Sequence, residues 1–242
     1  MYQVEEDHWW YVGLHHLVLL LLSQQHFCHD GFEILDAGCG TGKLLVRLGA
    51  LLGTSIGMDI APDAIEFTLM RKVNLLVRGS ICEMSFRSDI FGIVISLDVA
   101  SYMEVDDVRR AFAEMHRTLR PGGQLILNLP AYQCLRSSHD LALGMRHRFN
   151  KLELRSMLQD AGFTVDLCTY RNTLLFPVAA VVRILRRLSL KRRDIIRSDL
   201  KPVPAPINYM LSRLLFLENH LIRRRISLPV GLSLFSLARK QI

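Results

Sequence analysis

Three glycines at alternate positions, Gly38, Gly40 and Gly42, constrain the fold of this chain more than any other feature. The short apolar run Ile34–Leu35 precedes them, as in a buried parallel strand. Glycine permits positive φ and carries no Cβ, so the chain can turn sharply and lay backbone N–H groups against a ligand. Apolar residues at near-helical spacing over Leu44–Leu48 predict a helix that points its N-terminus at the bound group.

An acidic residue about twenty positions further on supports a nucleotide site. Asp59 closes the apolar segment Ser55–Met58, which predicts a second strand. A carboxylate at the carboxyl end of that strand can accept both hydroxyls of a ribose. The glycine spacing is G-x-G-x-G, which matches neither the dinucleotide fingerprint nor the Walker loop.

The run Asp36–Gly42 resembles motif I of the class I S-adenosylmethionine-dependent methyltransferases, in which an acid at the position of Asp59 holds the ribose. The apolar run Ile90–Asp98 resembles motif IV, whose last residues line the methionine end of the cofactor. Leu119–Gly123, followed by the predicted strand Gln124–Leu129, resembles a further signature of the family. The resemblance implies an enzyme that uses S-adenosyl-L-methionine and releases S-adenosyl-L-homocysteine.

The family commonly has an acid near Ser80 that touches the adenine, so here the contact falls to Ser80 and the backbone of Ile81 and Cys82. The aromatic stretch Trp9–Tyr11 resembles an N-terminal helix that caps the cofactor pocket in a bacterial subgroup; the alternative is that these rings only pack on the sheet. The implied cofactor-binding residues are Asp36, Gly38, Cys39, Gly40, Gly42, Asp59, Ile60, Ser80, Ile81, Leu97, Trp10 and Tyr11.

That subgroup continues with Gly-Arg-Arg, whereas this chain has Gly13-Leu14-His15. An arginine contact to the cofactor carboxylate or to an anionic substrate is therefore in question. The available substitutes are His15 and His16.

The substrate residues are expected on loops at the carboxyl ends of the strands, where ligands bind in open α/β sheets. Relatives often carry Glu-His where this chain has Ser101-Tyr102, and Tyr102 could still position a nucleophile. His139 paired with Asp140 could deprotonate a hydroxyl or amine; alternatively Asp140 caps a helical turn and a nearby arginine makes a surface ion pair. The candidates are Tyr102, His139 and Asp140 for catalysis and Tyr132, Arg146 and His147 for the substrate.

The predicted fold is α/β: a Rossmann-like, seven-stranded class I methyltransferase sheet with helices on both faces. The segments 163–170 and 232–238 are its expected sixth and seventh strands, the seventh antiparallel. One domain then covers residues 1–242, with an N-terminal helical cap at 1–30, a core at 31–173 and 229–242, and a helical insertion at 174–228.

Charge and cysteines bear on partners and location. The net charge is +7, and basic residues gather between Arg183 and Arg197, where three interpretations stay open: a solvated helix face, contact with a membrane or lipidic substrate, and nucleic acid. No aromatic-interleaved basic motif accompanies them, which disfavours nucleic acid. The five cysteines form no C-x-x-C pair and the acidic N-terminus is no secretory signal, so we expect reduced thiols and a cytoplasmic protein. The histidines share no metal-ligand spacing, and no metal is expected.

The predicted function is methyl transfer from S-adenosylmethionine to a small molecule, with apolar secondary metabolites in view, at oxygen, nitrogen or carbon. Such a transfer needs little covalent help, so the motifs imply no obligatory catalytic residue. One alternative is a sugar or lipid-linked saccharide acceptor. Another is a non-catalytic protein that binds cofactor or a partner. A homodimer and peripheral membrane contact complete the expected partners.

Overall fold

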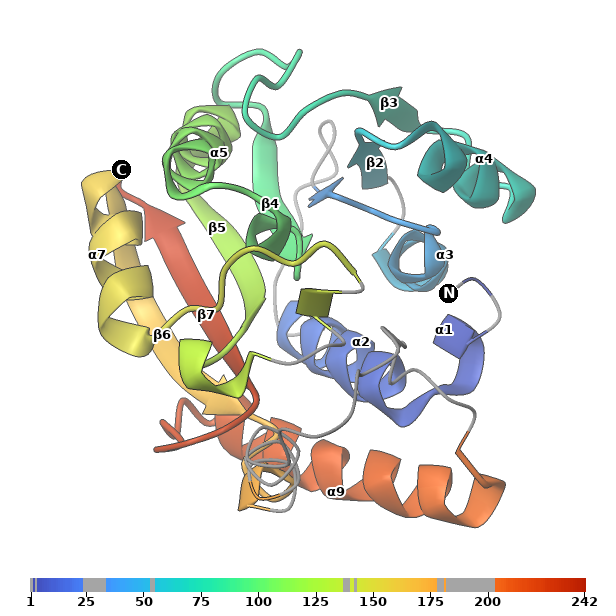
Figure 1. The fold of residues 1–242 in the computed structure, drawn as a ribbon. Coiled ribbons are helices and arrows are strands. Elements are labelled where there is room, and N and C mark those ends of the chain that lie inside the picture. Colours follow the sequence, from blue (N-terminus) through green and yellow to red (C-terminus); the bar gives the residue numbers. More distant parts are fainter. Residues whose placement is uncertain are drawn as a thin grey trace.

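A computed structural model describes residues 2, 4–23, 34–52, 55–136, 140–141, 143–177, 181 and 203–242 of the chain (Figure 1). Seven strands form one sheet in the order β3-β2-β1-β4-β5-β7-β6. Neighbouring strands from β3 to β5 are parallel, and β7 lies antiparallel between β5 and β6. The predicted sheet and its antiparallel seventh strand are confirmed. The strands are β1 (Ile34–Ala37), β2 (Ser55–Asp59), β3 (Leu76–Arg78), β4 (Phe91–Leu97), β5 (Leu119–Pro130), β6 (Phe163–Arg171) and β7 (Ser233–Lys240).

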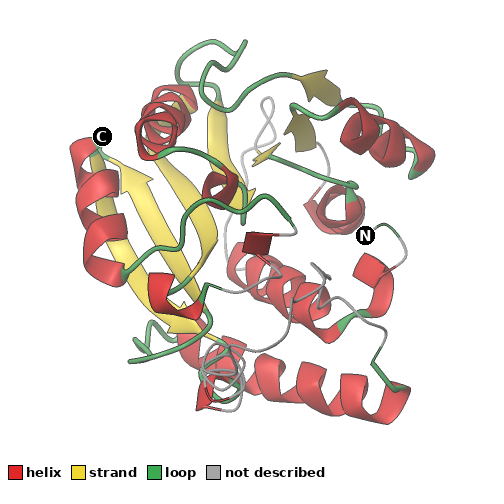
Figure 2. Ribbon diagram, viewed as in Figure 1, coloured by secondary structure: helices red, strands yellow, loops and turns green. Residues whose placement is uncertain are grey.

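Helices cover both faces of the sheet (Figure 2). Alternate residues of the strands face opposite sides: Leu35 and Val94 pack with α5 (Val105–Thr118) and α7 (Lys151–Asp160), whereas Ile34 and Ile93 pack with α2, α3 and α9. The bounds of this second set are Trp9–Leu22 for α2, Lys43–Leu52 for α3 and Ala205–Arg223 for α9. Three shorter helices, α1 (Val4–Asp7), η1 (Ala100–Tyr102) and η2 (Gln133–Leu135), and α4 (Pro62–Met70) beside β2 and β3 complete the described helices.

The predicted boundary before β5 was wrong by several residues. Helix α5 ends at Thr118, and Leu119 already pairs with Phe91 of β4. The register then shifts before Ile93 pairs with Gln124, and Gly122 takes a φ of 78° within this irregular stretch. The Pro-Gly-Gly run thus follows the end of the helix, and the chain passes through it as a bulged strand.

Helix α9 lies between β6 and β7 in the chain and packs along α2 (Figure 1). A Cβ on Gly13 would lie 2.5 Å from Cδ1 of Leu215, so glycine is what allows the two helices to approach closely. The Nδ2 of Asn219 donates to the Gly13 carbonyl (2.8 Å), and the Trp9 N–H donates to Oδ1 of Asn208 (2.8 Å). Helix α9 therefore fixes the position of the aromatic N-terminal helix.

Part of the predicted insertion, including the basic segment 183–197, lies outside the described residues. Within the described part, no helix is long and apolar enough to cross a membrane. The described side chains also contain no group of three or more histidine, cysteine or acidic residues placed to hold a metal ion.

Candidate active site

The glycine turn after β1 is shaped by its neighbours. Gly38 and Gly42 have φ values of 92° and 78°, and a Cβ on either would lie within 2.5 Å of a side chain, from Val99 and Thr68 respectively. Gly40, with a φ of 55°, would place its Cβ in open space. Close packing therefore requires glycine at two positions, whereas Gly40 leaves its side of the turn open to a ligand.

The sequence suggested that the turn presents its backbone N–H groups to a ligand. The first three of these groups bond within the protein instead. The N–H groups of Gly38 and Cys39 donate to the Met58 carbonyl at 2.7 and 3.0 Å, and the Gly40 N–H donates to Oδ2 of Asp59 at 2.9 Å. These bonds tie the turn to β2. The turn thus offers close approach to its backbone rather than free donors at these three positions.

Asp59 is held by two backbone groups. Besides Gly40, the Ala61 N–H donates to its Oδ1 at 2.9 Å. Each carboxylate oxygen keeps further acceptor capacity, and Asp59 lines the cavity described below. This geometry suits the pair of hydroxyls on a ribose.

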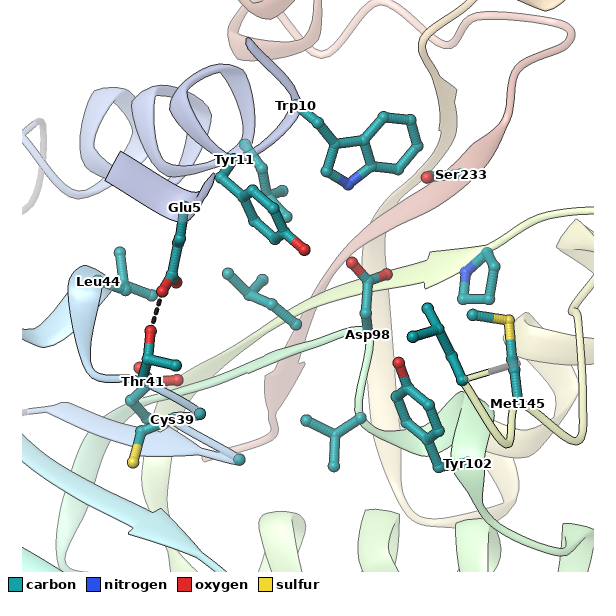
Figure 3. Close-up of a pocket in the computed structure, with 18 of the residues that line it drawn as sticks. Glu5, Trp10, Tyr11, Cys39, Thr41, Leu44, Asp98, Tyr102, Met145 and Ser233 are labelled. Carbon is teal, nitrogen blue, oxygen red and sulfur yellow. Dashed lines mark hydrogen bonds between the residues drawn. The ribbon is translucent and has the colours of Figure 1, made fainter. Parts of the chain in front are cut away.

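Two buried acids lie close to the same turn. Burial, together with the negative charges of Glu5 and Asp59, raises the pKa of Asp36 to about 8. Glu5 comes from α1 and accepts a hydrogen bond from the Thr41 hydroxyl (Figure 3), and burial also raises the pKa of its carboxyl. The turn therefore favours a ligand that brings hydroxyls or positive charge.

Charged side chains fasten α1 over the turn. Glu6 pairs with Lys43 and Arg71, and these cations lower the pKa of its carboxyl. Arg71 also donates from Nε to the Thr41 carbonyl at 2.7 Å, and its guanidinium lies 4.2 Å above the Tyr2 ring. The chain start is thus attached to the nucleotide turn through contacts far apart in sequence.

One cavity of about 900 Å³ joins the turn to the helices above it (Figure 3). Its wall on one side holds the glycine turn, Asp59, and Ser80 and Ile81 after β3. On the other side lie Asp98 and residues from the loops after β5 and β6, from α9 and from the start of β7. Most of that second wall is apolar: Trp10, Leu143, Met145, Leu175, Leu211 and Leu232.

The structure brings almost all predicted cofactor residues to this cavity. Asp36, Gly38, Cys39, Gly40, Asp59, Ile60, Ser80, Ile81, Leu97, Trp10 and Tyr11 line it. Gly42 does not, because it lies behind the turn against Thr68. Their contacts with a cofactor stay a prediction.

His15, not His16, faces the cavity. Burial lowers the pKa of His15 to about 3, with smaller contributions from cations that include Arg47 and Arg171, so its imidazole is neutral. His16 instead stacks on Phe216, with ring centroids 4.1 Å apart. The bacterial subgroup has two arginines at the positions of Leu14 and His15. A neutral imidazole does not supply the positive charge of either arginine.

The three predicted substrate residues do not line the cavity. Tyr132 stacks on Tyr170, with ring centroids 4.8 Å apart; Arg146 pairs with Glu104 at the surface; and Nε2 of His147 lies 2.6 Å from Oε1 of Glu153. The sequence analysis correctly predicted that these three residues lie on the segment that follows β5. Their side chains point elsewhere because each has a partner outside the cavity.

Only one member of the expected His139–Asp140 pair lies within the described residues. His139 lies outside the described residues, and Asp140 forms a buried two-pronged ion pair with Arg148, with both N–O distances 2.8 Å. Arg148 also donates to the Ala131 carbonyl at 2.9 Å. Asp140 and Arg148 line the cavity, as does Tyr102, but the Asp140 carboxylate is engaged by the guanidinium.

The acid that follows β4 belonged to the run that resembles motif IV but was not among the predicted site residues. Asp98 lines the cavity with a φ of 63°, and its Oδ1 accepts from Nδ2 of Asn128 at 2.8 Å. The signal was present, since an acid at the carboxyl end of a central parallel strand faces the ligand crevice. Ser233, on β7, could not have been found, because nothing nearby in sequence links it to the site.

Comparisons with known proteins agree with this geometry. Residues 35–127 match the family model described as "Methyltransferase domain". A probable S-adenosylmethionine-dependent methyltransferase of Mycolicibacterium smegmatis is 27% identical over 165 residues, 67% of this chain and 62% of that protein. The malonyl-[acyl-carrier protein] O-methyltransferase of Hahella chejuensis is 32% identical over 116 residues, 43% of this chain and 38% of the relative. The chain thus spans less than two thirds of the length of these relatives.

The fold has a close match among solved structures. A Haloferax volcanii protein solved in complex with the Trm112 methyltransferase activator superposes with a TM-score of 0.62 at 18% identity, covering 99% of this chain and 93% of that one. At this identity the likeness concerns the fold alone.

The residues present fit S-adenosylmethionine, the cofactor of this family. Gly40 leaves space against the turn, the backbone-held Asp59 suits the ribose, and buried acids lie where a cationic group would lower their proton affinity. The matching family model, the sheet order and this site agree: residues 35–127 and the fold of this chain are similar to those of the class I S-adenosylmethionine-dependent methyltransferases.

Proposed function

We propose that this chain transfers the methyl group of S-adenosylmethionine to a small molecule with a largely apolar body. The observation that carries this proposal is the continuity of the cavity, because one space of about 900 Å³ runs from the glycine turn to an apolar wall. Positioning and desolvation supply much of the rate of such a transfer. Closure by α1, α2 and α9 would exclude water from the reacting groups.

The cavity also limits the size of the acceptor. Its volume is at the upper end of the usual range for small-molecule sites, about 300–1,000 Å³, and it has to hold the cofactor as well. The malonyl-[acyl-carrier protein] O-methyltransferase among the relatives supports a metabolite acceptor, because its name records methylation of a small acyl group. Oxygen, nitrogen and carbon remain candidate positions.

A sugar or lipid-linked saccharide acceptor is the second candidate. It depends on the basic segment 183–197, which lies outside the described residues, and the apolar wall favours the first candidate. A non-catalytic role is disfavoured because the turn, Asp59 and the cavity are all intact. The reaction is proposed for the cytoplasm, in line with the free thiols of Cys39, Cys82, Cys134 and Cys168, while a homodimer and membrane contact stay predictions.

Calorimetric titration with S-adenosylmethionine and S-adenosylhomocysteine tests the cofactor site. We expect binding to the native chain, a loss of at least about tenfold in Asp59→Ala from the missing hydrogen bonds, and no measurable binding to Gly40→Val. Gly122→Val is the matched control, because Gly122 also has a positive φ (78°) and its Cβ would meet only Ile242 at 3.7 Å, but it lies in β5 and does not line the cavity. No binding to the native chain would refute the proposal.

Transfer of a radioactive methyl group then separates the two acceptor classes. Metabolite extracts are incubated with labelled cofactor and the native chain, with Gly40→Val as the background. Label in small products that partition into organic solvent supports an apolar acceptor. Label in water-soluble or lipid-linked saccharides would favour the second candidate.

A further inference from the structure

Asp98 is a cavity acid at the end of the run Ile90–Asp98, and the resemblance of that run to motif IV gives its carboxylate no role in the reaction. It follows the last residue of β4, and Figure 3 shows its carboxylate across the cavity from Glu5 and Thr41. Its side chain is half-buried, with the exposed part on the cavity. An acid there lies beyond the nucleotide turn, on the side of the apolar wall.

The backbone of Asp98 is held firmly in the left-handed region. Its φ is 63°, its N–H donates to the Asn128 carbonyl at 2.7 Å, and its carbonyl accepts from the Ser101 hydroxyl at 2.6 Å. Such a conformation is costly for most residues and tolerated by aspartate and asparagine. Strained backbone of this kind is concentrated at functional sites.

The two oxygens of the carboxylate differ. Oδ1 accepts from Nδ2 of Asn128, which orients the group, whereas Oδ2 has no hydrogen-bond partner among the residues that the structure describes. Asn128 is fully buried on β5, so it cannot swing away. One oxygen is thus fixed and the other is available to a ligand.

Polar groups from several elements face this oxygen. Figure 3 shows the hydroxyls of Tyr11 and Tyr102 pointing toward Asp98. Ser233 lies on the same side, and its buried hydroxyl has no partner in the described part of the chain. A buried hydroxyl at a cavity wall is available to bond a ligand group or a water molecule.

The charges around Asp98 are balanced rather than acidic. Arg148 is paired with Asp140, and the fully buried Arg171 of β6 lies within electrostatic range of both Asp98 and Glu218. The two arginines favour the ionised form of Asp98, and burial opposes it. No second unpaired carboxylate competes for a proton among the described residues beside Asp98, because Asp140 is engaged by Arg148.

We propose that Asp98 is the general base of this enzyme and that its acceptors carry an O–H or N–H nucleophile on an apolar body. This inference rests on the proposed function and narrows it, because it excludes acceptors that react without losing a proton. Hydroxyls and primary or secondary amines belong to the predicted class.

The proton and electron balance of the step is simple. The bound cofactor supplies the methyl group, and its sulfur keeps the electron pair of the broken carbon–sulfur bond. Oδ2 of Asp98 takes the proton of the nucleophile, whose freed electron pair forms the bond to the methyl carbon. Asp98 ends neutral and returns the proton to water when the products leave.

The proton affinity of Asp98 suits this role. Burial raises its pKa to about 6, against the lowering effects of the Asn128 hydrogen bond and the two arginines. The carboxylate is then ionised at pH 7.5 and is a stronger base than an exposed aspartate. Burial and the charge of Asp98 together raise the pKa of the Tyr11 and Tyr102 hydroxyls, which stay protonated and can donate.

The test uses the chain loaded with S-adenosylhomocysteine and two matched probes, 4-octylphenol and its methyl ether, which lacks the proton. Aspartate labelled with ¹³C at the side-chain carboxyl reports the ionisation of Asp98 by NMR, and Asp98→Asn assigns the signal. Asparagine keeps the left-handed backbone and can accept from Asn128, so the variant should fold. Tyr102→Phe, which keeps the carboxylate, is the control.

We expect the Asp98 signal to titrate at a pH of about 6 and to shift with the phenol but not with the ether. The native chain should prefer the phenol by about tenfold or more, and Asp98→Asn should lose most of that preference. With S-adenosylmethionine in place of S-adenosylhomocysteine, methylation of the phenol should be slower by about a hundredfold or more in Asp98→Asn, and the native rate should rise with pH through the same midpoint. Tyr102→Phe should keep this midpoint.

An Asp98 signal that ignores the phenol, or an equal preference for the phenol in Asp98→Asn, would overturn the inference. Binding of S-adenosylhomocysteine separates this from failure of the proposed function. If the native chain and Asp98→Asn bind it equally well, the cofactor site stands and only the role of Asp98 is wrong.

Discussion

Two sides of the cavity are built in different ways: the side of the glycine turn, where we propose the cofactor (the cofactor side), and the side of Asp98 and the apolar wall, where we propose the acceptor (the acceptor side). On the cofactor side, residues 36–42 and 59–61 bond mainly to one another, as in the contacts from Gly40 and Ala61 to Asp59. On the acceptor side, Asp98, Arg148 and Ser233 come from three distant segments, and buried pairs such as Asp140–Arg148 hold them. A local site can be recognised from a motif, whereas an assembled site depends on the packing of the whole chain.

The largest expected effect comes from removing the buried ion pair on the acceptor side. Asp140→Ala leaves Arg148 as a buried, uncompensated charge, and we expect the free energy of unfolding in urea to fall by about 3–5 kcal/mol. Affinity for S-adenosylhomocysteine, measured where the variant is folded, should change less than about twofold if the two sides are independent.

The double variant Asp140→Leu/Arg148→Met is the control for this prediction. It removes both charges, so it should recover much of the lost stability. Equal destabilisation in the single and double variants would mean that packing, rather than the unpaired charge, holds this side together.

A smaller effect concerns His15, which lies between the two sides. Its pKa is lowered to about 3 in the folded chain, so acid protonates the unfolded state first, and stability is lost as pH falls below about 6.5. Between pH 7 and pH 5 the native chain should lose about 2 kcal/mol more than His15→Gln, as measured by urea unfolding.

The comparison with His15→Gln isolates this residue from Asp36. Asp36 has its pKa raised to about 8, so its contribution has the opposite sign: stability falls as pH rises from about 4 to 8. Parallel pH profiles for the native chain and His15→Gln would show that His15 titrates normally.

The smallest effect concerns a residue that the sequence placed in the substrate site. Arg146 and Glu104 form an exposed pair, with 58% and 68% of their side-chain surfaces accessible. Arg146→Ala should therefore change stability by less than about 1 kcal/mol, and the binding of 4-octylphenol by less than about twofold. A large loss of phenol binding would show that Arg146 reaches the acceptor after all.

Secondary structure was predictable wherever local patterns were strong. Asn150 is the N-cap of α7 with a full capping box to Glu153, and Pro62 opens α4; both are helix-start signals that depend on neighbouring residues alone. The start of β5 was missed because a Pro-Gly-Gly run stops a helix but does not reveal whether the chain then pairs with Phe91.

The site residues divide in the same way, into those fixed by local sequence patterns and those placed by contacts with distant residues. Asp59 and Gly40 could be recognised because their spacing alone dictates a turn against a strand end. Tyr132, Arg146 and His147 were placed on the correct loop, yet nothing in their spacing shows that Tyr170, Glu104 and Glu153 would draw them away from the cavity.

The sequence by itself indicated the resemblance to the methyltransferase family, the glycine turn against β2 and the alternation of strands and helices. These depend on backbone conformation and hydrophobic periodicity, which act over a few residues. Only the tertiary structure decided that Asp98 faces the cavity with a free oxygen, that Arg148 neutralises Asp140, and that α9 holds the aromatic helix in place. Those outcomes depend on which distant side chains share a buried environment, and the cost of burying an unpaired charge or hydrogen-bonding group selects among them.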